Sequence, residues 1–265
     1  MTDSLNRAAE EYFGIKADPD DLEKLRAHLL KTYGSESPEI LEKAFSSGEA
    51  AAFLTVNETY FFREPAHFEF LRDYLISFEK STIRICSAAV ATGCEAYSIA
   101  MLIENSNKSF KNPLFYHIDA FDINPLVIKA AREGLYGERA LRDDGSCFHS
   151  LAEPYLKKRE GRYRIEYQAD VSLQENICFF EHNLMNKLQA VYDLIFFRNA
   201  FIYFTDQKRG RILSNLSSAL NEGGSLIMGV SETAGVHHPA LEAQNKNDVF
   251  YFKKVSQQSP VLPGR

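Results

Sequence analysis

The chain has 265 residues, of which 45% are hydrophobic, and its 36 acidic residues outnumber 30 basic ones to give a formal net charge of −6. This length suits one large domain with a small appendage, and the acidic balance argues against a protein that coats nucleic acid. No apolar run approaches the roughly 20 residues that span a bilayer, and the first residues lack the basic and apolar segments of a signal peptide. We therefore expect a cytoplasmic protein without membrane insertion.

Residues 1–55 are predicted to form a small N-terminal helical domain. Asp18-Pro19-Asp20 and Ser37-Pro38-Glu39 each place an N-cap residue before a proline in a first helical turn. The region is acidic, because eleven carboxylates face six lysines or arginines between residues 1 and 50. A further helix is predicted to begin at Pro65.

From residue 82 onward, short apolar strands alternate with amphipathic helices. This alternation predicts an α/β fold in which helices cover both faces of a mostly parallel sheet. Strands are expected at 83–86, 116–121, 192–197, 225–230 and 249–252, and helices at 96–103, at 125–131 and from 206.

Two segments depart from this alternation. Residues 161–180 contain apolar residues at every second position, which predicts a small antiparallel β insertion. Residues 256–265 have the composition of a disordered tail.

Cysteine spacing gives no sign of a metal site or a disulfide framework. The four cysteines (Cys86, Cys94, Cys147 and Cys178) form no C-x-x-C pair and have no zinc-ligand spacing. We expect reduced thiols and no bound metal.

Three candidate positions follow predicted strands, where ligands bind in open parallel sheets. The turn 87–95 consists mostly of small residues and is either a ligand loop or a plain strand-to-helix turn. Asp122 either accepts the ribose hydroxyls of a nucleoside, or caps the next helix or forms an Asx-turn over 122–125. Arg198 and Asn199 are either part of a site or solvated loop residues.

The string Asn57-Glu58-Thr59-Tyr60-Phe61-Phe62-Arg63-Glu64-Pro65 resembles the N-E-T-x-F-F-R-E signature of the chemotaxis receptor methyltransferases of the CheR type. Further matches occur in the family's order over residues 56–254. They lie at 85–101, 121–124, 183–184, 196–204, 223–224 and 229–232.

The resemblance implies a class I, Rossmann-like methyltransferase domain at 56–255, preceded by the helical domain. It implies S-adenosylmethionine as cofactor and glutamate side chains of a chemoreceptor-like protein, in an acidic helical region, as the acceptor. Arg63 and Tyr203 match positions beside the reacting centre. Cofactor contacts are implied at Asn57, Thr59, Arg63, Glu95, Asp122, Asn183 and Asn199, with backbone contacts at Leu184 and Ala200. The aromatic strings 60–62 and 196–204 are expected to wall the methyl-transfer site.

Two departures from the family bear on the substrate. The N-terminal region is acidic where receptor-methylating members carry basic residues, and this acidity would repel a glutamate-rich helix. The β insertion lacks the glycine-rich loop of members that dock on a receptor's C-terminal pentapeptide, so we expect the protein to act without binding a pentapeptide. We also expect a monomer. A basic cluster either steers an acidic substrate or is a solvated face. It comprises Lys157, Lys158, Arg159, Arg162 and Arg164.

Two alternatives to receptor methylation stay open. The first is a cofactor-binding regulatory or scaffold module of the same type without receptor methylation. The second is a methyltransferase with a different substrate. A nicotinamide oxidoreductase is disfavoured, because the 87–95 turn has only one glycine where a dinucleotide loop has three.

Overall fold

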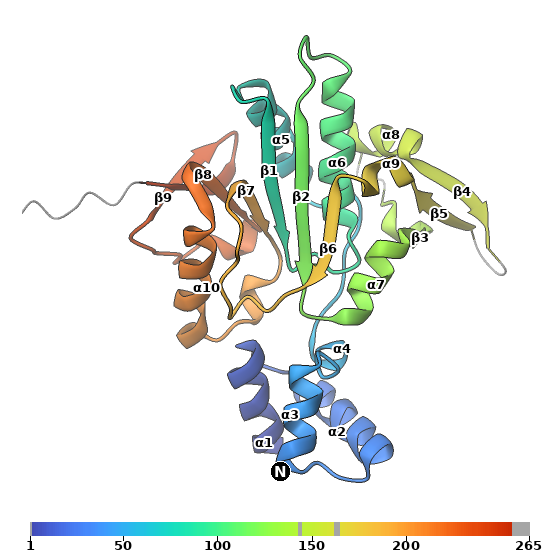
Figure 1. The fold of residues 1–265 in the computed structure, drawn as a ribbon, viewed down its shortest axis with the longest axis vertical. Helices are drawn as coiled ribbons and strands as arrows, with labels where there is room; N and C mark the ends of the chain where they lie inside the picture. Colours follow the sequence, from blue (N-terminus) through green and yellow to red (C-terminus); the bar gives the residue numbers. More distant parts are fainter. Residues whose placement is uncertain (1, 143–144, 162–164, 256–265) are drawn as a thin grey trace, which may run out of the picture.

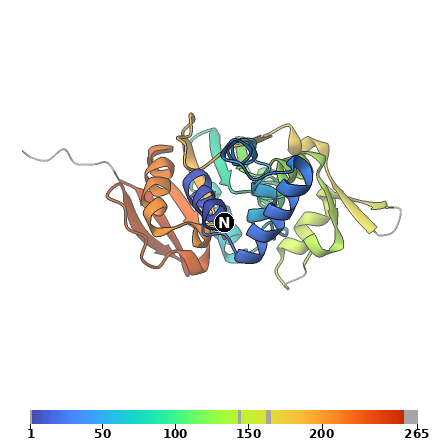
Figure 2. The same ribbon diagram turned by 90° about the horizontal axis from the view of Figure 1, so that it is seen from below.

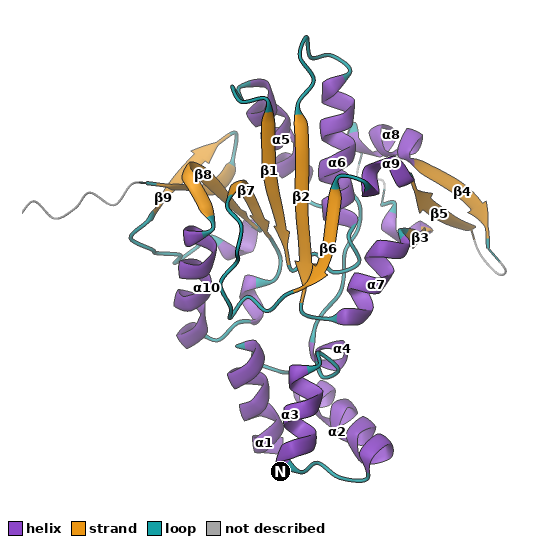
Figure 3. Ribbon diagram, viewed as in Figure 1, coloured by secondary structure: helices purple, strands orange, loops and turns teal. Residues whose placement is uncertain are grey.

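The computed structural model describes residues 2–142, 145–161 and 165–255. A group of short helices from the N-terminus lies against one end of a large sheet, and a small separate sheet projects from the side (Figure 1). Colouring by secondary structure shows the large sheet flanked by helices (Figure 3). In the described part of the chain, no helix has both the length and the apolar character needed to cross a bilayer.

The N-terminal helices pack around their own apolar cluster, which includes Leu5, Leu25 and Phe45. Asp18 caps its helix as predicted, since its side chain accepts a hydrogen bond from the backbone N–H of Asp20 at 2.9 Å. The elements here are α1 (Thr2–Ala8), η1 (Ala9–Phe13), α2 (Pro19–Tyr33), α3 (Pro38–Ser46) and α4 (Ala51–Leu54). A domain boundary at residue 55 stays a prediction.

The main sheet has the order β6-β2-β1-β7-β8-β10-β9 within the described residues. Neighbours from β6 to β8 run parallel, whereas β10 is antiparallel to both β8 and β9. The predicted α/β class is therefore confirmed. The strands are β1 (Thr82–Ala88), β2 (Phe115–Asp122), β6 (Ile177–Glu181), β7 (Tyr192–Phe197), β8 (Leu220–Met228), β9 (Leu241–Lys246) and β10 (Val249–Lys254).

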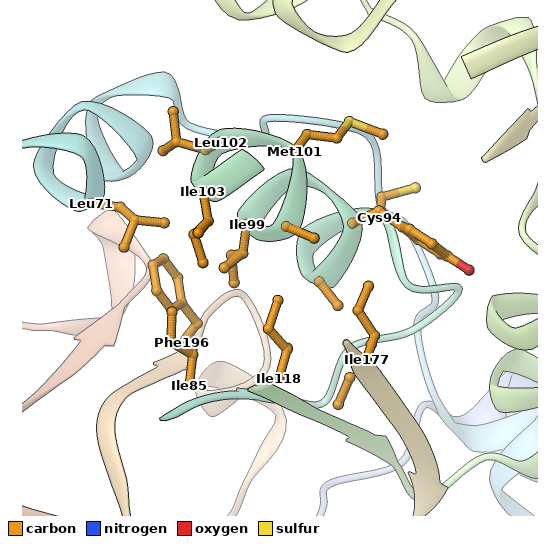
Figure 4. Close-up of a cluster of buried hydrophobic side chains, with 14 of the residues drawn as sticks. Leu71, Ile85, Cys94, Ile99, Met101, Leu102, Ile103, Ile118, Ile177 and Phe196 are labelled. Carbon is orange, nitrogen blue, oxygen red and sulfur yellow. The ribbon is translucent and has the colours of Figure 1, made fainter. Parts of the chain in front are cut away.

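Helices bury both faces of the sheet, and alternate residues of each strand point to opposite sides. On one face, Ile85 and Ile118 pack beneath Ile99 and Ile103 of α6 (Figure 4). On the other face, Phe197 packs with residues of α10. The main helices are α5 (Pro65–Ile76), α6 (Cys94–Asn107), α7 (Pro125–Glu133) and α10 (Asp206–Ser218).

The predicted β insertion at 161–180 is wrong at both ends. The small sheet has the order β3-β5-β4, so it begins at residue 135 and ends at 169. The segment 177–181 is instead strand β6, which runs parallel to β2 in the main sheet. Its alternating pattern marks a strand correctly but does not reveal which sheet the strand joins. The insertion comprises β3 (Leu135–Gly137), η2 (Glu138–Ala140), α8 (Phe148–Ala152), η3 (Glu153–Tyr155), β4 (Leu156–Glu160) and β5 (Ile165–Ala169), and is followed by α9 (Val171–Gln174).

The N-terminal helices are joined to the sheet through main-chain contacts at one loop. The Thr205 N–H donates to the Gly14 carbonyl oxygen, and the Lys16 N–H donates to the Tyr203 carbonyl oxygen, each at 2.9 Å. These two bonds flank an isolated β-bridge between Ile15 and Phe204. Viewed from below, the blue N-terminal helices lie across the end of the sheet (Figure 2). The loop that contacts them contains η4 (Phe201–Tyr203), and η5 (Val230–Glu232) follows β8.

Gly93, which precedes α6, is a position where a larger residue should lower the stability of the fold. It has φ +91°, and an added Cβ would lie 2.9 Å from the Ala131 Cβ. We expect Gly93→Ala to lower the free energy of unfolding by about 1–3 kcal/mol in urea denaturation. Gly210 in α10 is the control, because a Cβ there meets nothing within 4 Å and alanine should stabilise the helix by about 0.5–1 kcal/mol. Equal effects of the two substitutions would contradict this expectation.

Candidate active site

A cleft lies between the carboxyl ends of the central strands and the N-terminal helices. Strand β1 has β2 on one side and β7 on the other, so the cleft lies at the switch in strand order where open α/β sheets bind ligands.

The structure brings all the residues that the sequence assigned to the site into this one cleft, although their individual roles stay predictions. The lining includes Asn57, Thr59, Arg63, Glu95, Asp122, Asn183, Leu184, Asn199, Ala200 and Tyr203.

The buried guanidinium of Arg198 joins three walls of the cleft. Its Nη1 donates to Glu95 Oε2 at 2.8 Å, and its Nη2 donates to the Arg63 carbonyl oxygen and to Glu64 Oε2. Because Arg198 is only 6% exposed, these contacts replace the hydration of the charge. Arg198 therefore ties the end of β7 to α6 and to the signature loop. Of the two alternatives that the sequence left for Arg198, a site residue or a solvated loop residue, the structure favours the first, because Arg198 is buried and lines the cleft.

Glu95 is already engaged by the protein through both carboxylate oxygens. Oε1 accepts the Ser87 hydroxyl at 2.7 Å, and Oε2 accepts Arg198. Each carboxylate oxygen has a second lone pair. The cofactor contact predicted for Glu95 would have to use these remaining acceptor positions.

Asp122 is buried at the end of β2 and faces the cleft. Its two oxygens accept the backbone N–H groups of Asn124 and Ala91, each at 3.0 Å. Burial raises the pKa of this carboxyl, and the backbone donors offset the rise only in part. Asp122 is not the N-cap of α7, because the Asn124 side chain caps that helix by accepting from Leu126 N at 3.0 Å. The Asx-turn alternative is confirmed, because Asp122 accepts the N–H two residues further on. The unused lone pairs of Asp122 suit a vicinal diol such as ribose.

Left-handed backbone conformations concentrate around the cleft. Such φ values are uncommon for residues with a side chain and tend to occur at functional sites. Within the described residues, three of the seven non-glycine cases line the cleft: Ala89 (φ 57°), Ala91 (φ 50°) and Asn199 (φ 59°). Two more, Phe62 (φ 54°) and Glu64 (φ 59°), lie in the signature loop next to it.

The N-terminal segment supplies part of the wall, which the sequence did not predict. Phe13 and Ile15 line the cleft. The Asn183 amide donates to the Tyr12 carbonyl oxygen at 2.6 Å, across 171 positions of sequence. No local pattern indicates a contact over that separation, because it depends on how the helices pack on the sheet.

The expectation that the aromatic strings wall the site is correct only in part. Tyr60, Tyr203 and Phe204 line the cleft. The other phenylalanines of these strings pack in the hydrophobic clusters, because the strands and loops that carry them are buried on the sheet's faces. They are Phe61, Phe62, Phe196, Phe197 and Phe201.

The contacts of Glu64 allow a prediction of how the stability of the fold depends on pH. Burial acts to raise the pKa of its carboxyl, but contacts with His67, Arg198 and Asn199 outweigh burial and hold the pKa below its usual range. A carboxyl with a lower pKa in the folded state stabilises the fold above its unfolded pKa, near 4.3, and loses this stabilisation as the pH falls.

We therefore expect the free energy of unfolding to decrease below about pH 4.3, and to decrease less in Glu64→Gln. Urea denaturation at pH 7, 5 and 3.5 measures both proteins. Glu242→Gln, at an exposed position on β9, serves as the control. If the free energy of unfolding falls equally with pH in wild type and in Glu64→Gln, the lowered pKa assigned to Glu64 is contradicted.

Comparison with known proteins gives a consistent result. The family model "CheR methyltransferase, SAM binding domain" matches residues 57–250. A probable chemotaxis protein methyltransferase of Rhizobium etli is 34% identical over 192 residues, covering 69% of this chain and 70% of the relative. The chemotaxis protein methyltransferase of Borreliella burgdorferi is 30% identical over 230 residues, covering 80% of this chain and 79% of the relative. The chemotaxis protein methyltransferase of Escherichia coli is 33% identical over 199 residues, covering 73% of this chain and 68% of the relative.

The parallel sheet, the cleft at its switch point and the matched domain define an S-adenosylmethionine-dependent methyltransferase of class I. More narrowly, the chain belongs to the CheR methyltransferase family. The residues present fit the cofactor, because Asp122 keeps free acceptor positions and faces the cleft at the switch point of the sheet.

Proposed function

We propose that the protein methylates glutamate side chains of a chemoreceptor-type signalling protein, acting as a cytoplasmic monomer. The observation that carries the proposal is the single cleft in which the signature loop, Asp122 and the Asn199–Tyr203 loop meet. Relatives named chemotaxis protein methyltransferases support it.

The proposed acceptor needs no general base. A glutamate has a pKa of about 4.3, so at pH 7 it is already an anionic nucleophile. The carboxylate oxygen forms a bond to the methyl carbon as the carbon–sulfur bond breaks, which gives a methyl ester and S-adenosylhomocysteine without proton transfer. The protein therefore has to align the carboxylate oxygen with the methyl carbon and the sulfur, and to exclude water from the carboxylate.

Cys94 is disfavoured as a nucleophile, because it is fully buried and does not line the cleft. Burial raises the pKa of the Cys94 thiol to about 12, and the nearby Thr92 and Thr59 hydroxyls offset this only in part. The thiol therefore stays protonated at neutral pH.

S-adenosylmethionine supplies an activated methyl group on a sulfonium. Asp122 would hold the ribose, and Arg63 would hold a carboxylate of either the cofactor or the acceptor. Tyr203 would position the methyl group or the acceptor through its hydroxyl. Further contacts are proposed for Asn57, Thr59, Glu95, Asn183 and Asn199, and for the backbone of Leu184 and Ala200.

Tyr203→Phe tests the role of the hydroxyl. We expect kcat to fall about tenfold with little change in stability, because only a hydrogen bond at the reacting centre is lost. Tyr60→Phe is the matched control in the same cleft, and a smaller effect is expected there. A Tyr203→Phe enzyme that turns over at the wild-type rate would remove Tyr203 from the reacting centre.

We propose that the acceptor is bound without a pentapeptide tether. One charge of the basic cluster is paired on β4, where Lys157 lies 2.9 Å from Asp170. Arg159 donates to the uncharged Gln168 at 2.9 Å and keeps its positive charge. Arg162 and Arg164 lie outside the described residues. Isothermal calorimetry with a receptor C-terminal pentapeptide should show no binding, and measurable heat of binding would refute this point.

The function is tested by incubating the protein with radiolabelled S-adenosylmethionine and purified cytoplasmic fragments of the organism's own chemoreceptors. We expect label that alkali releases as methanol, which identifies a carboxyl methyl ester. Receptor fragments with glutamine at the candidate glutamates are the control and should take up no label.

Other outcomes separate the alternatives. Binding of S-adenosylmethionine without transfer to any receptor would favour a regulatory module or another acceptor. Alkali-stable label would indicate a nucleophile other than a carboxylate.

A further inference from the structure

Glu232 is a buried carboxylate outside the cleft that contacts the backbone of the active-site loop. It is 4% exposed and does not line the cleft. Its Oε2 accepts the backbone N–H of Asn199 at 2.6 Å and that of Gly229 at 3.0 Å, and its Oε1 accepts the N–H of Ile202 at 3.3 Å. A carboxylate that accepts several backbone donors is tightly held, and so are the donors.

The loop that Glu232 holds carries residues assigned to the site. It includes Asn199, whose φ of 59° is strained for a residue with a side chain, and it leads into Tyr203. On the opposite side, Glu64 Oε1 accepts the Asn199 side-chain amide at 2.9 Å. Asn199 is thus held by one carboxylate through its backbone and by another through its side chain.

Gly229 allows this close approach. A Cβ there would lie 2.6 Å from Glu232 Oε2 and 3.0 Å from the Asn199 side-chain nitrogen. The glycine and the glutamate at 229 and 232 therefore act as one unit, in which the small residue makes room for the carboxylate against the loop.

We propose that Glu232 is a positioning residue for methyl transfer, which holds Asn199 to Tyr203 in the geometry that binds the cofactor. It touches no reacting atom, and it acts through the backbone N–H groups of Asn199 and Ile202. Glu232 is therefore expected to affect the affinity for the cofactor, whichever acceptor the protein methylates.

A graded series of variants tests the proposal. In Glu232→Gln, an oxygen at the Oε2 position keeps the bonds to Asn199 and Gly229, while an NH2 group faces the Ile202 N–H without accepting it. Glu232→Met removes every acceptor at similar length. Glu242→Gln, exposed on β9, is the control.

Calorimetry with S-adenosylhomocysteine should give a Kd raised about threefold in Glu232→Gln and by tenfold or more in Glu232→Met. Hydrogen exchange should show faster exchange at Ile202 alone in the glutamine variant, and at both Asn199 and Ile202 in the methionine variant. The control should match wild type in both measurements.

The results separate positioning from a merely structural role. If the variants lower the unfolding temperature but bind S-adenosylhomocysteine with wild-type affinity, the proposal is overturned. If Glu232→Met does not fold, the glutamine variant decides: a Kd for S-adenosylhomocysteine equal to that of wild type, despite faster exchange at Ile202, overturns the proposal. The binding measurement needs no acceptor protein, so it can be interpreted even if receptor methylation is disproved.

Discussion

Arg63→Ala should lower kcat by about 100-fold or more while the protein stays folded. A positioned charge at a reacting centre typically contributes factors of about 10²–10³ in rate. Arg63 lines the cleft, where its Nη1 donates to the Glu58 carbonyl oxygen at 2.9 Å and its guanidinium lies 5.7 Å from the Tyr60 ring centroid. Neither contact leaves a buried charge unpaired when the side chain is removed, so the fold should tolerate the change.

Radiolabel transfer under saturating cofactor measures kcat, and circular dichroism verifies folding. Arg72→Ala, exposed on α5, is the matched control and should retain full activity. Wild-type turnover by folded Arg63→Ala would exclude Arg63 from the reacting centre.

Arg198→Met should have the largest effect on stability. It removes the arginine charge shared by Glu64 and Glu95. Glu64 then keeps only its contacts with His67 and Asn199, and Glu95 keeps only the Ser87 hydroxyl. Losing one member of a buried ion pair costs about 3–5 kcal/mol. We expect the lower end, because the Glu64 and Glu95 side chains retain 24% and 15% exposure. For a chain of this size, a loss of about 3 kcal/mol corresponds to a Tm lower by roughly 6–12 °C.

Thermal and urea denaturation measure this loss. Lys24→Met removes an exposed pair with Asp21 and should change stability by less than about 0.5 kcal/mol. Adding Glu64→Gln to Arg198→Met should recover part of the loss, because one stranded charge is removed. If the double variant is less stable than Arg198→Met, the ion network is assigned wrongly.

The main sheet could be predicted from the sequence because each central strand is a short apolar run, as in 192–197, which the structure reproduces as β7. Strand β9 was not predicted, since Leu241–Lys246 is an edge strand with mostly exposed polar residues. Strand β8 begins at Leu220, five residues before the predicted start at 225, and its pairing with β7 shifts register between Tyr192 and Leu194 of β7. Such an irregularity has no distinct sequence pattern.

The site residues were predictable because ordered motifs name them, but the connections between them were not. Glu64 and Glu232 belong to matched motifs, yet only the structure shows that both contact Asn199. Phe13 and Ile15 belong to no motif and reach the cleft only through tertiary packing.

The backbone bonds that join Gly14 and Lys16 to Thr205 and Tyr203 have a consequence for chimeric proteins. If the N-terminal helices of a relative were grafted onto this sheet, the graft would replace a wall of the cleft. A larger residue at Gly14 would be strained, because φ is +75° there and its Cβ would lie 2.9 Å from Met185 Sδ. Sequence changes in these helices are therefore constrained by the loop that carries Tyr203, and the two segments are expected to change together.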